Sequence, residues 1–356
     1  MKHTTTVPVL SVCGMCNKRG TVNQSFNNQG ENKLNKLKGI TKILIAAGIS
    51  VAVFALLACS TSDSGPSTSD DSAVAAKGYK NPDRIVSVAW LNKHINDENL
   101  VIVDVRSLTE GEPVKYNEGH IPGAINIPAN TTFQQTVDGV KGMLPSAAHI
   151  EGVLSDHGVK ATDTIIFYDD IKSLWASRAL WGMDVYGHKD SKLLDGDINL
   201  WIAKGYATSQ ETATLAKSNY KFSGSPNTEL IVDLDTVAKS IEGKAEVLDT
   251  RSSDEYVGKN LRGNARGGHI PGSVLVEWKQ NAAEDGSFLP AKDLKDLYAS
   301  VNIVSGDEIY TLCQTAVRAT HSWFVLSELL GYPNISVYDG SAIEYANRED
   351  TALEIR

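Results

Sequence analysis

The chain has 356 residues, of which 42% are hydrophobic and 22% charged, a composition typical of globular domains with sizeable cores. Its formal net charge is −9. Removal of residues 1–58 would take away seven of the 34 Lys and Arg and one of the 43 Asp and Glu, which leaves 27 basic and 42 acidic residues and a net charge of −15. A surface this acidic repels nucleic acid and anionic headgroups, so we expect neither as a partner.

The N-terminal region has the pattern of a targeting segment. After the basic stretch that ends at Lys42, an uncharged run extends from Ile43 to Cys59. The run is slightly short for a spanning helix, and a basic region followed by a short apolar core is typical of a secretory signal. The sequence LLAC, residues 56–59, resembles a bacterial lipoprotein box, which implies cleavage of 1–58 and lipidation of Cys59. An uncleaved N-terminal anchor is the alternative.

Both alternatives place the rest of the chain outside the cytoplasm. We expect a lipid-anchored protein of the cell envelope that faces the periplasm or the extracellular side. Ser60 lacks the aspartate associated with retention in the inner membrane, which favours the outer membrane in a Gram-negative cell. The segment that follows is rich in Ser, Thr and Asp and predicts a flexible tether over residues 59–80.

The remaining chain repeats itself. VIVDVR (101–106) returns as EVLDTR (246–251), GHIPGAINIP (119–128) as GHIPGSVLVE (268–277), and VYGHKDSKLLDG (185–196) as LLGYPNISVYDG (329–340). The matches keep their order at nearly constant offsets, so we predict two copies of one domain, over residues 81–212 and 213–356.

Within each copy, short apolar runs alternate with helical patterns. The runs are typical of parallel strands buried on both faces, and they cover residues 100–105, 164–169, 192–195, 245–250, 308–313 and 335–339. Residues 173–188 and 316–332 have apolar residues at helical spacing, and each pattern stops at a glycine, Gly187 or Gly331. This alternation predicts an α/β fold in which each domain has a mostly parallel sheet with helices on both faces.

Two repeated features near the strand ends are interpreted as structural. Asp249 and Arg251, like their counterparts in the first copy, leave a strand end two residues apart and can pair with each other to fix a loop. His269 belongs to a GHIPG turn that occurs in both copies. Two histidines in separate domains cannot converge on one metal ion, so hydrogen bonds within the turn are the expected role, and no metal site is predicted.

Cysteine usage directs attention to Cys313. The chain contains four cysteines, at positions 13, 16, 59 and 313. The first two form a lone CxxC in the region expected to be removed, and Cys59 is the expected lipidation site. One thiol then remains without a disulfide partner in an oxidising compartment, so Cys313 is either an inert buried thiol or a reactive one.

The surroundings of Cys313 favour reactivity. The residue ends a predicted strand, and a helix is expected to begin near Val317 or Arg318. Successive backbone amides and the helix N-terminus would then point at the sulfur and stabilise a thiolate. The loop residues of this cradle are Gln314, Thr315, Ala316, Val317 and Arg318. The corresponding position of the first copy is Asp169, so any chemistry is expected in the second copy alone.

Taken together, these motifs resemble the tandem-domain rhodaneses, which are thiosulfate or 3-mercaptopyruvate sulfurtransferases. The matching residues are DVR and DTR, the doubled GHIPG, LLDG and VYDG, and CQTAVR at the family's active loop. The resemblance covers roughly residues 83–350. It implies an inactive first domain and a cofactor-free double displacement, in which Cys313 takes sulfur from a small donor anion as a persulfide and passes it to cyanide or a thiol.

Several residues depart from the family pattern. Alanine stands at 316 where glycine is usual, which is unstrained only at negative φ. Ala342 replaces an aromatic residue after DGS, and Glu255 stands where animal-type enzymes place a donor-binding arginine. The candidates for donor binding are therefore Arg318 first and Arg262 or Arg266 second. Gln314 and Thr315 in place of Gly-Ser favour thiosulfate over 3-mercaptopyruvate.

Two rival functions share this plan. Rhodanese-like phosphatases need five residues between the cysteine and the arginine, whereas four separate Cys313 from Arg318, and this smaller loop suits a single sulfur atom. The other rival is a carrier or sensor of sulfane sulfur that forms a persulfide without turnover.

Overall fold

A computed structural model describes residues 68–241, 243 and 245–355. The proposed signal peptide and the lipidation site at Cys59 lie outside these residues. Among the helices that the structure describes, none combines the length and apolarity needed to cross a membrane.

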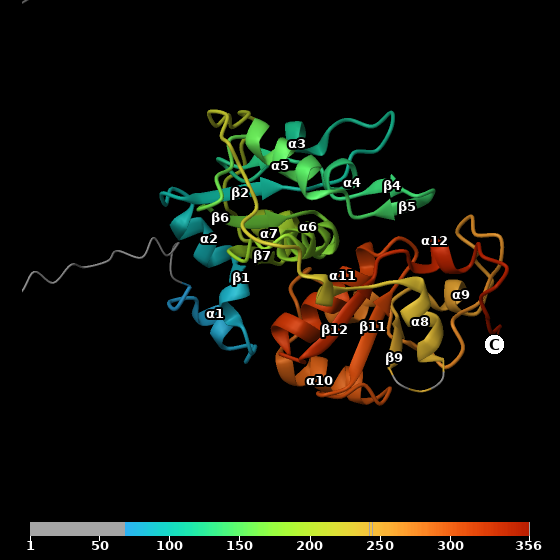
Figure 1. The fold of residues 1–356 in the computed structure, drawn as a ribbon. Helices are drawn as coiled ribbons and strands as arrows, with labels where there is room; N and C mark the ends of the chain where they lie inside the picture. Colours follow the sequence, from blue (N-terminus) through green and yellow to red (C-terminus); the bar gives the residue numbers. More distant parts are fainter. Residues whose placement is uncertain (1–67, 242, 244, 356) are drawn as a thin grey trace, which may run out of the picture. The chain divides into compact units, whose positions relative to one another are not determined.

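The first domain is built on a five-stranded parallel sheet with the strand order β1-β7-β6-β2-β3 (Figure 1). Its strands are β1 (Ile85–Ser87), β2 (Leu100–Asp104), β3 (Ile125–Asn126), β6 (Thr164–Tyr168) and β7 (Ser191–Asp195). An antiparallel hairpin, β4 (Gln135–Val137) and β5 (Val140–Met143), lies outside the sheet. The helical segments are η1 (Pro82–Arg84), α2 (Val88–His94), α3 (Lys115–Glu118), α4 (Ala129–Thr132), α5 (Ala147–Asp156), α6 (Leu174–Val185) and α7 (Asp197–Ala203).

The second domain repeats this topology. Its parallel sheet has the order β10-β9-β11-β12-β8, so every strand has a counterpart in the first sheet. The strands are β8 (Ile231–Val232), β9 (Glu246–Asp249), β10 (Val274–Leu275), β11 (Glu308–Leu312) and β12 (Asn334–Tyr338). The helical segments are η2 (Thr228–Leu230), α8 (Leu234–Ser240), α9 (Ser253–Tyr256), η3 (Trp278–Asn281), α10 (Ala291–Ala299), α11 (Val317–Trp323), its π-helical continuation η4 (Phe324–Leu329) and α12 (Ser341–Tyr345).

These observations confirm the predicted fold class. The six apolar runs form the central strands, and burial is nearly complete along them, because helices cover both faces of a parallel sheet. Gly187 and Gly331 follow the helices with φ of +91° and +70°, a conformation that glycine adopts without strain.

The expected tether needs a correction, because its last residues belong to the folded part. Asp71 caps α1 (Ser72–Ala75), and its carboxylate accepts hydrogen bonds from the amide and hydroxyl of Ser87. Val74 and Tyr79 are buried. The apolar side chains among these residues give the segment enough surface to bury, so the part of 59–80 from Asp71 onward does not form a flexible tether.

The boundary predicted at residues 212/213 also differs from the packing. Ala213, Ser218 and Phe222 donate backbone hydrogen bonds to first-domain groups, and Tyr220 is 1% exposed. The connecting segment therefore packs on the first domain before the chain enters the second.

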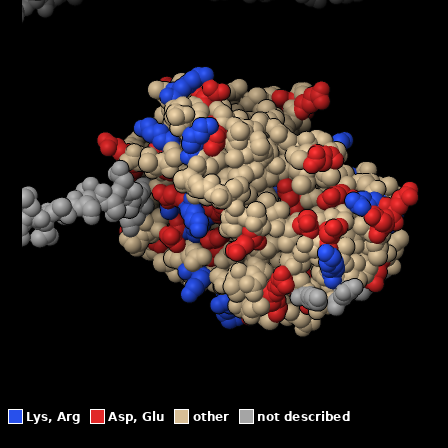
Figure 2. All heavy atoms as spheres, in the orientation of Figure 1, with Lys and Arg blue, Asp and Glu red and all other residues tan. Residues whose placement is uncertain are grey.

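Figure 2 shows acidic side chains spread over the visible face with basic ones between them.

Candidate active site

Cys313 lies where the sequence predicts, immediately after β11 and four residues before the α11 residue Val317. It is 1% exposed, and among the described residues it is a free cysteine. The sequence pattern predicts a reactive sulfur with accessible amides around it. The structure differs on access, because Cys313 is almost completely buried.

The loop amides are only partly available for an anion. The amides of Cys313 and Ala316 both donate to the Oγ atom of Ser341, at 3.3 and 3.1 Å, and the amide of Val317 donates to the carbonyl of Thr315. In the described part of the chain, the amides of Gln314 and Thr315 have no acceptor. The predicted cradle is therefore narrower than a full ring, because Ser341 already occupies one side of it.

Ala316 adopts a left-handed backbone conformation with φ of +60° and ψ of −8°. The condition for an unstrained alanine, a negative φ, is not met. The conformation lets the chain turn directly from the strand into the helix. A left-handed residue other than glycine costs about 1–2 kcal/mol, which the surrounding contacts must offset.

The equivalent loop of the first domain shows what such a cradle can hold. The Asp169 carboxylate accepts hydrogen bonds from four backbone amides, those of Ile171, Ser173, Trp175 and Ala176, at 2.6–3.1 Å. Asp169 is fully buried. In the first domain the cradle is thus filled by the chain's own carboxyl group, whereas in the second the amides of Val317 and Thr320, the counterparts of Ser173 and Ala176, donate to backbone carbonyls instead.

Arg318 is held by Glu255. The two guanidinium nitrogens donate to the two carboxylate oxygens at 2.7 and 2.8 Å, and Glu255 is 3% exposed. Burial opposes ionisation of Glu255, but the Arg318 hydrogen bonds and charge lower its pKa to about 2. The pKa of Arg318 is raised despite its burial, because it hydrogen-bonds to Glu255 and interacts with the Cys313 sulfur. Arg318 therefore lies beside the thiol with its charge paired.

The other two donor-binding candidates differ in availability. The Arg262 side chain is 56% exposed and lies 3.9 Å from Glu255. Arg266 instead donates to the backbone carbonyls of the C-terminal segment, including those of Tyr345 and Thr351. These contacts give Arg266 a structural role, and Arg262 is the more accessible of the two cations.

The residues interpreted as structural make the contacts expected of them. Asp249 and Arg251 form a buried pair in which the guanidinium donates to both carboxylate oxygens, at 2.6–3.0 Å. The Nδ1 atom of His269 lies 2.9 Å from the carbonyl of Tyr256, and the two rings stack at 3.7 Å. Burial alone would lower the pKa of Arg251, but the Asp249 charge raises it, and the Cys313 sulfur contributes in the same direction.

The first domain contributes residues to this loop that the sequence patterns did not predict. Arg178 donates to the Asp339 carboxylate at 2.6 Å, and the side-chain amide of Gln134 donates to the carbonyl of Thr315 at 3.1 Å. The only signal for Arg178 is a charged residue inside an otherwise apolar helical pattern. Contacts between the two copies leave no periodic trace in the sequence.

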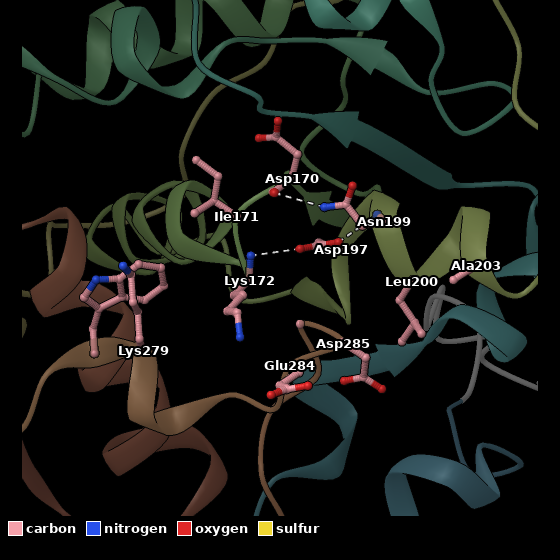
Figure 3. Close-up of a pocket in the computed structure, with 12 residues that line it drawn as sticks. Asp170, Ile171, Lys172, Asp197, Asn199, Leu200, Ala203, Lys279, Glu284 and Asp285 are labelled. Atoms are coloured by element: carbon pink, nitrogen blue, oxygen red, sulfur yellow. Dashed lines mark hydrogen bonds between the residues drawn. The ribbon is translucent and has the colours of Figure 1, made fainter.

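A pocket of about 370 Å³ lies beside the Asp169 loop, and Cys313 does not line it. Figure 3 shows Asp170, Lys172 and Asp197 on one side and Glu284 and Asp285 opposite them. Four of these five residues are acidic, so the pocket does not favour an anionic sulfur donor.

Comparisons with known proteins agree with this geometry. The model of the rhodanese-like domain matches residues 87–204 and 233–348. A protein of Saccharopolyspora erythraea named "Putative thiosulfate sulfurtransferase" is 32% identical over 277 residues, which is 76% of this chain and 95% of the relative. The sulfur carrier protein TtuD of Thermus thermophilus is 31% identical over 283 residues, 76% of this chain and 96% of the relative.

The structure of an anaerobic ergothioneine biosynthesis enzyme from Chlorobium limicola superimposes with a TM-score of 0.69 at 21% identity, covering 78% of this chain and 71% of that one. At this identity the likeness supports the fold alone. The two family matches fall on the two parallel-sheet domains, and the thiol loop lies in the second. The chain therefore belongs to the tandem-domain rhodanese family of sulfurtransferases.

Proposed function

We propose that the protein is a thiosulfate sulfurtransferase in which Cys313 carries the transferred sulfur as a persulfide. The observation that supports this most directly is the position of Cys313 at a strand-to-helix junction whose counterpart in the first domain places the buried Asp169 carboxyl group against four backbone amides. Free backbone amides at such a junction can stabilise the negative charge of a persulfide.

The first step transfers sulfur to the protein. The Cys313 thiolate attacks the outer sulfur of thiosulfate, a new S–S bond forms to Cys313, and the S–S bond of thiosulfate breaks with its electron pair leaving on sulfite. The amides of Gln314 and Thr315 have no other acceptor among the described residues, so they can donate to the terminal sulfur.

The second step returns the thiolate. Cyanide or a thiolate acceptor attacks the terminal sulfur, and the Cys313 S–S bond breaks with its electron pair returning to Cys313. Thiocyanate or an acceptor persulfide leaves. No metal ion or organic cofactor enters either step, because sulfur serves as both nucleophile and leaving group.

Arg262 is the cation best placed to meet an incoming donor anion, because it is exposed and lies near the Arg318–Glu255 pair. Arg318 lies closer to the sulfur and stabilises negative charge on it, in spite of its own pairing. Arg266 is assigned no part in donor binding.

Intact mass measurement tests the proposal. The soluble chain that begins at residue 60 is incubated with thiosulfate, desalted and weighed, and then treated with cyanide. We expect a gain of one sulfur atom that cyanide removes as thiocyanate, and no gain in Cys313→Ser. A persulfide that forms but does not turn over would favour the carrier or sensor function, and faster turnover with 3-mercaptopyruvate would make that the donor.

We also propose that the mature chain is lipidated at Cys59 and held at the cell envelope. The support is the uncharged run that ends in LLAC and the acidic charge of the rest. Expression in a bacterium with labelled palmitate should label the full chain and leave Cys59→Ser unlabelled in the soluble fraction. A labelled Cys59→Ser protein would contradict the assignment.

A further inference from the structure

We propose that Arg178, a residue of the domain without a thiol, is a positioning residue for the Cys313 loop and acts through Asp339. The inference rests on the proposed function and adds to it a requirement for the first domain in the transfer step. Its support is a continuous series of buried contacts from α6 of the first domain to the backbone of Cys313.

The Arg178 guanidinium is fixed on three sides. Arg178 is 0% exposed, and its Nη1 atom donates to Asp339 Oδ1 at 2.6 Å. Its Nε atom donates to the carbonyl of Phe133 at 3.1 Å, and Nη2 donates to the carbonyl of Gly142 at 3.1 Å. A planar fork held at each nitrogen defines the position of the carboxylate that it binds.

Asp339 connects Arg178 to the residues that hydrogen-bond to the Cys313 loop. The residue follows β12 and is 3% exposed, and its second oxygen accepts the amide of Leu144 at 2.7 Å. Close behind it in the chain, Ser341 Oγ accepts the amides of Cys313 and Ala316. The amides of Ala342 and Ile343 donate to the carbonyls of Cys313 and Gln314 at 2.9 and 3.0 Å. A shift of Asp339 would therefore alter each of these contacts at once.

The hairpin that Arg178 holds also contacts the loop directly. Gln134 precedes β4 and donates to the carbonyl of Thr315. Gly142 in β5 has φ of +82°, and a Cβ atom there would lie 2.7 Å from the Cβ of Thr315. The first domain therefore contacts the middle of the loop at Thr315, while Arg178 holds Asp339 beside the loop.

A comparison of the two halves shows that the arginine serves only the half with the cysteine. When the repeated motifs LLDG and VYDG are aligned, Asp195 corresponds to Asp339, and it accepts the amide of Phe288 just as Asp339 accepts that of Leu144. The cation that pairs with Asp195 is Lys77, whose side chain is 19% exposed. In the same alignment the counterpart of Arg178 is a serine, at position 322. The hydrogen bond from a backbone amide to the aspartate is present in both halves. The buried arginine that pairs with the aspartate is present only beside the Cys313 loop.

The test compares single-turnover persulfide formation, followed by quenched intact mass, across a thiosulfate series. The variants are Arg178→Met, Arg178→Lys, Asp339→Asn and the double variant Arg178→Met/Asp339→Asn. The matched control is Arg84→Met, because Arg84 also pairs carboxylates of both domains, the buried Asp184 and the partly buried Glu328, but has no hydrogen bond or ion pair with the loop. Thermal unfolding is recorded for each variant.

We expect Arg178→Met to lower the maximal rate about a hundredfold, the effect of a displacement of about 1 Å in a reacting group, with half-saturating thiosulfate changed less than threefold. Arg178→Lys keeps the charge but loses the planar guanidinium, so its rate should lie between those of the unaltered protein and Arg178→Met. The double variant removes the unpaired buried carboxylate and should recover thermal stability without recovering the rate. Arg84→Met should lose stability and keep the rate.

A rate in Arg178→Met within twofold of the unaltered protein would overturn the inference, and so would a double variant that recovers both stability and rate. If Arg178→Met does not fold, Arg178→Lys decides by the same twofold criterion. Absence of persulfide in the unaltered protein would instead contradict the proposed function, so the two failures are distinguishable.

Discussion

Ser341 and Asp197 occupy equivalent positions in the alignment of the two halves, and each has a left-handed backbone with φ of 50°. Ser341 Oγ accepts the amide of Ala316 at 3.1 Å, and Asp197 Oδ2 accepts the amide of Lys172 at 2.9 Å. Ala316 and Lys172 also correspond to each other in this alignment. Each domain therefore carries a polar side chain that fixes the turn between its central strand and the following helix.

Replacement of Ser341 by alanine should loosen the thiol loop. The amides of Cys313 and Ala316 would lose their acceptor in a buried site, which costs about 1–3 kcal/mol. We expect a lower urea midpoint and slower persulfide formation. Ser336→Ala is the control, because its hydroxyl bonds the carbonyl of Glu229 in an exposed site, and it should change stability by less than about 0.5 kcal/mol. Equal effects of the two changes would contradict this role.

Ala316→Gly should stabilise the protein. The left-handed backbone strains alanine by about 1–2 kcal/mol, and the greater entropy of unfolded glycine offsets part of the gain, so a net increase of about 0.5–1 kcal/mol in the unfolding free energy is expected. Chemical denaturation measures it. Ala299→Gly, at an exposed helical position, should lower stability by a similar amount. A loss of stability in Ala316→Gly would show that the alanine methyl group contributes more than the strain.

Asp169→Ala should destabilise the first domain and leave the transfer chemistry intact. Four backbone amides, two of them in fully buried hydrogen bonds, would lose one shared acceptor, and a cost of about 2–3 kcal/mol follows from the desolvation of such groups. At a temperature where the variant remains folded, its persulfide yield should match that of the unaltered chain. Asp170→Ala, which removes a partly exposed pair with Lys115, should cost less than about 1 kcal/mol. A persulfide yield that falls with Asp169→Ala would assign the first loop a part in catalysis.

His321 should make the fold sensitive to acid. Burial lowers its pKa to about 3, although its hydrogen bond to the Lys172 carbonyl acts in the opposite direction. The unfolded chain takes up the proton below about pH 6.5 and the folded chain only near pH 3, so this contribution is complete above pH 6.5 and is lost as pH falls. About 2 kcal/mol should be gone at pH 5.

Guanidinium unfolding at pH 7 and pH 5 measures this loss. His321→Gln should flatten the dependence, whereas the same change at the partly exposed His157 should not. An unchanged difference between the two pH values in His321→Gln would exclude His321 as its source.

The central features of the site were predictable because local patterns encode them. Continuous apolar runs indicate β6 and β11, and the position of Cys313 between such a run and a helical pattern predicts its place at the strand end. The edge strands β3, β8 and β10 have two residues each, too few for any periodicity. Arg178 was missed because its function depends on a contact with Asp339, 161 residues away. The left-handed backbone of Ala316 was not predicted, because alanine itself favours negative φ.

The near-complete burial of Cys313 determines which atom an acceptor meets. A disulfide bond is about 2.05 Å long, so the terminal sulfur of the proposed persulfide lies that distance beyond the buried Cys313 sulfur. In the resting protein, the Cys313 thiol is poorly accessible to bulky oxidants and thiols because it is buried. In the proposed cycle an acceptor meets this terminal atom rather than the Cys313 sulfur itself, and its release restores the buried thiolate.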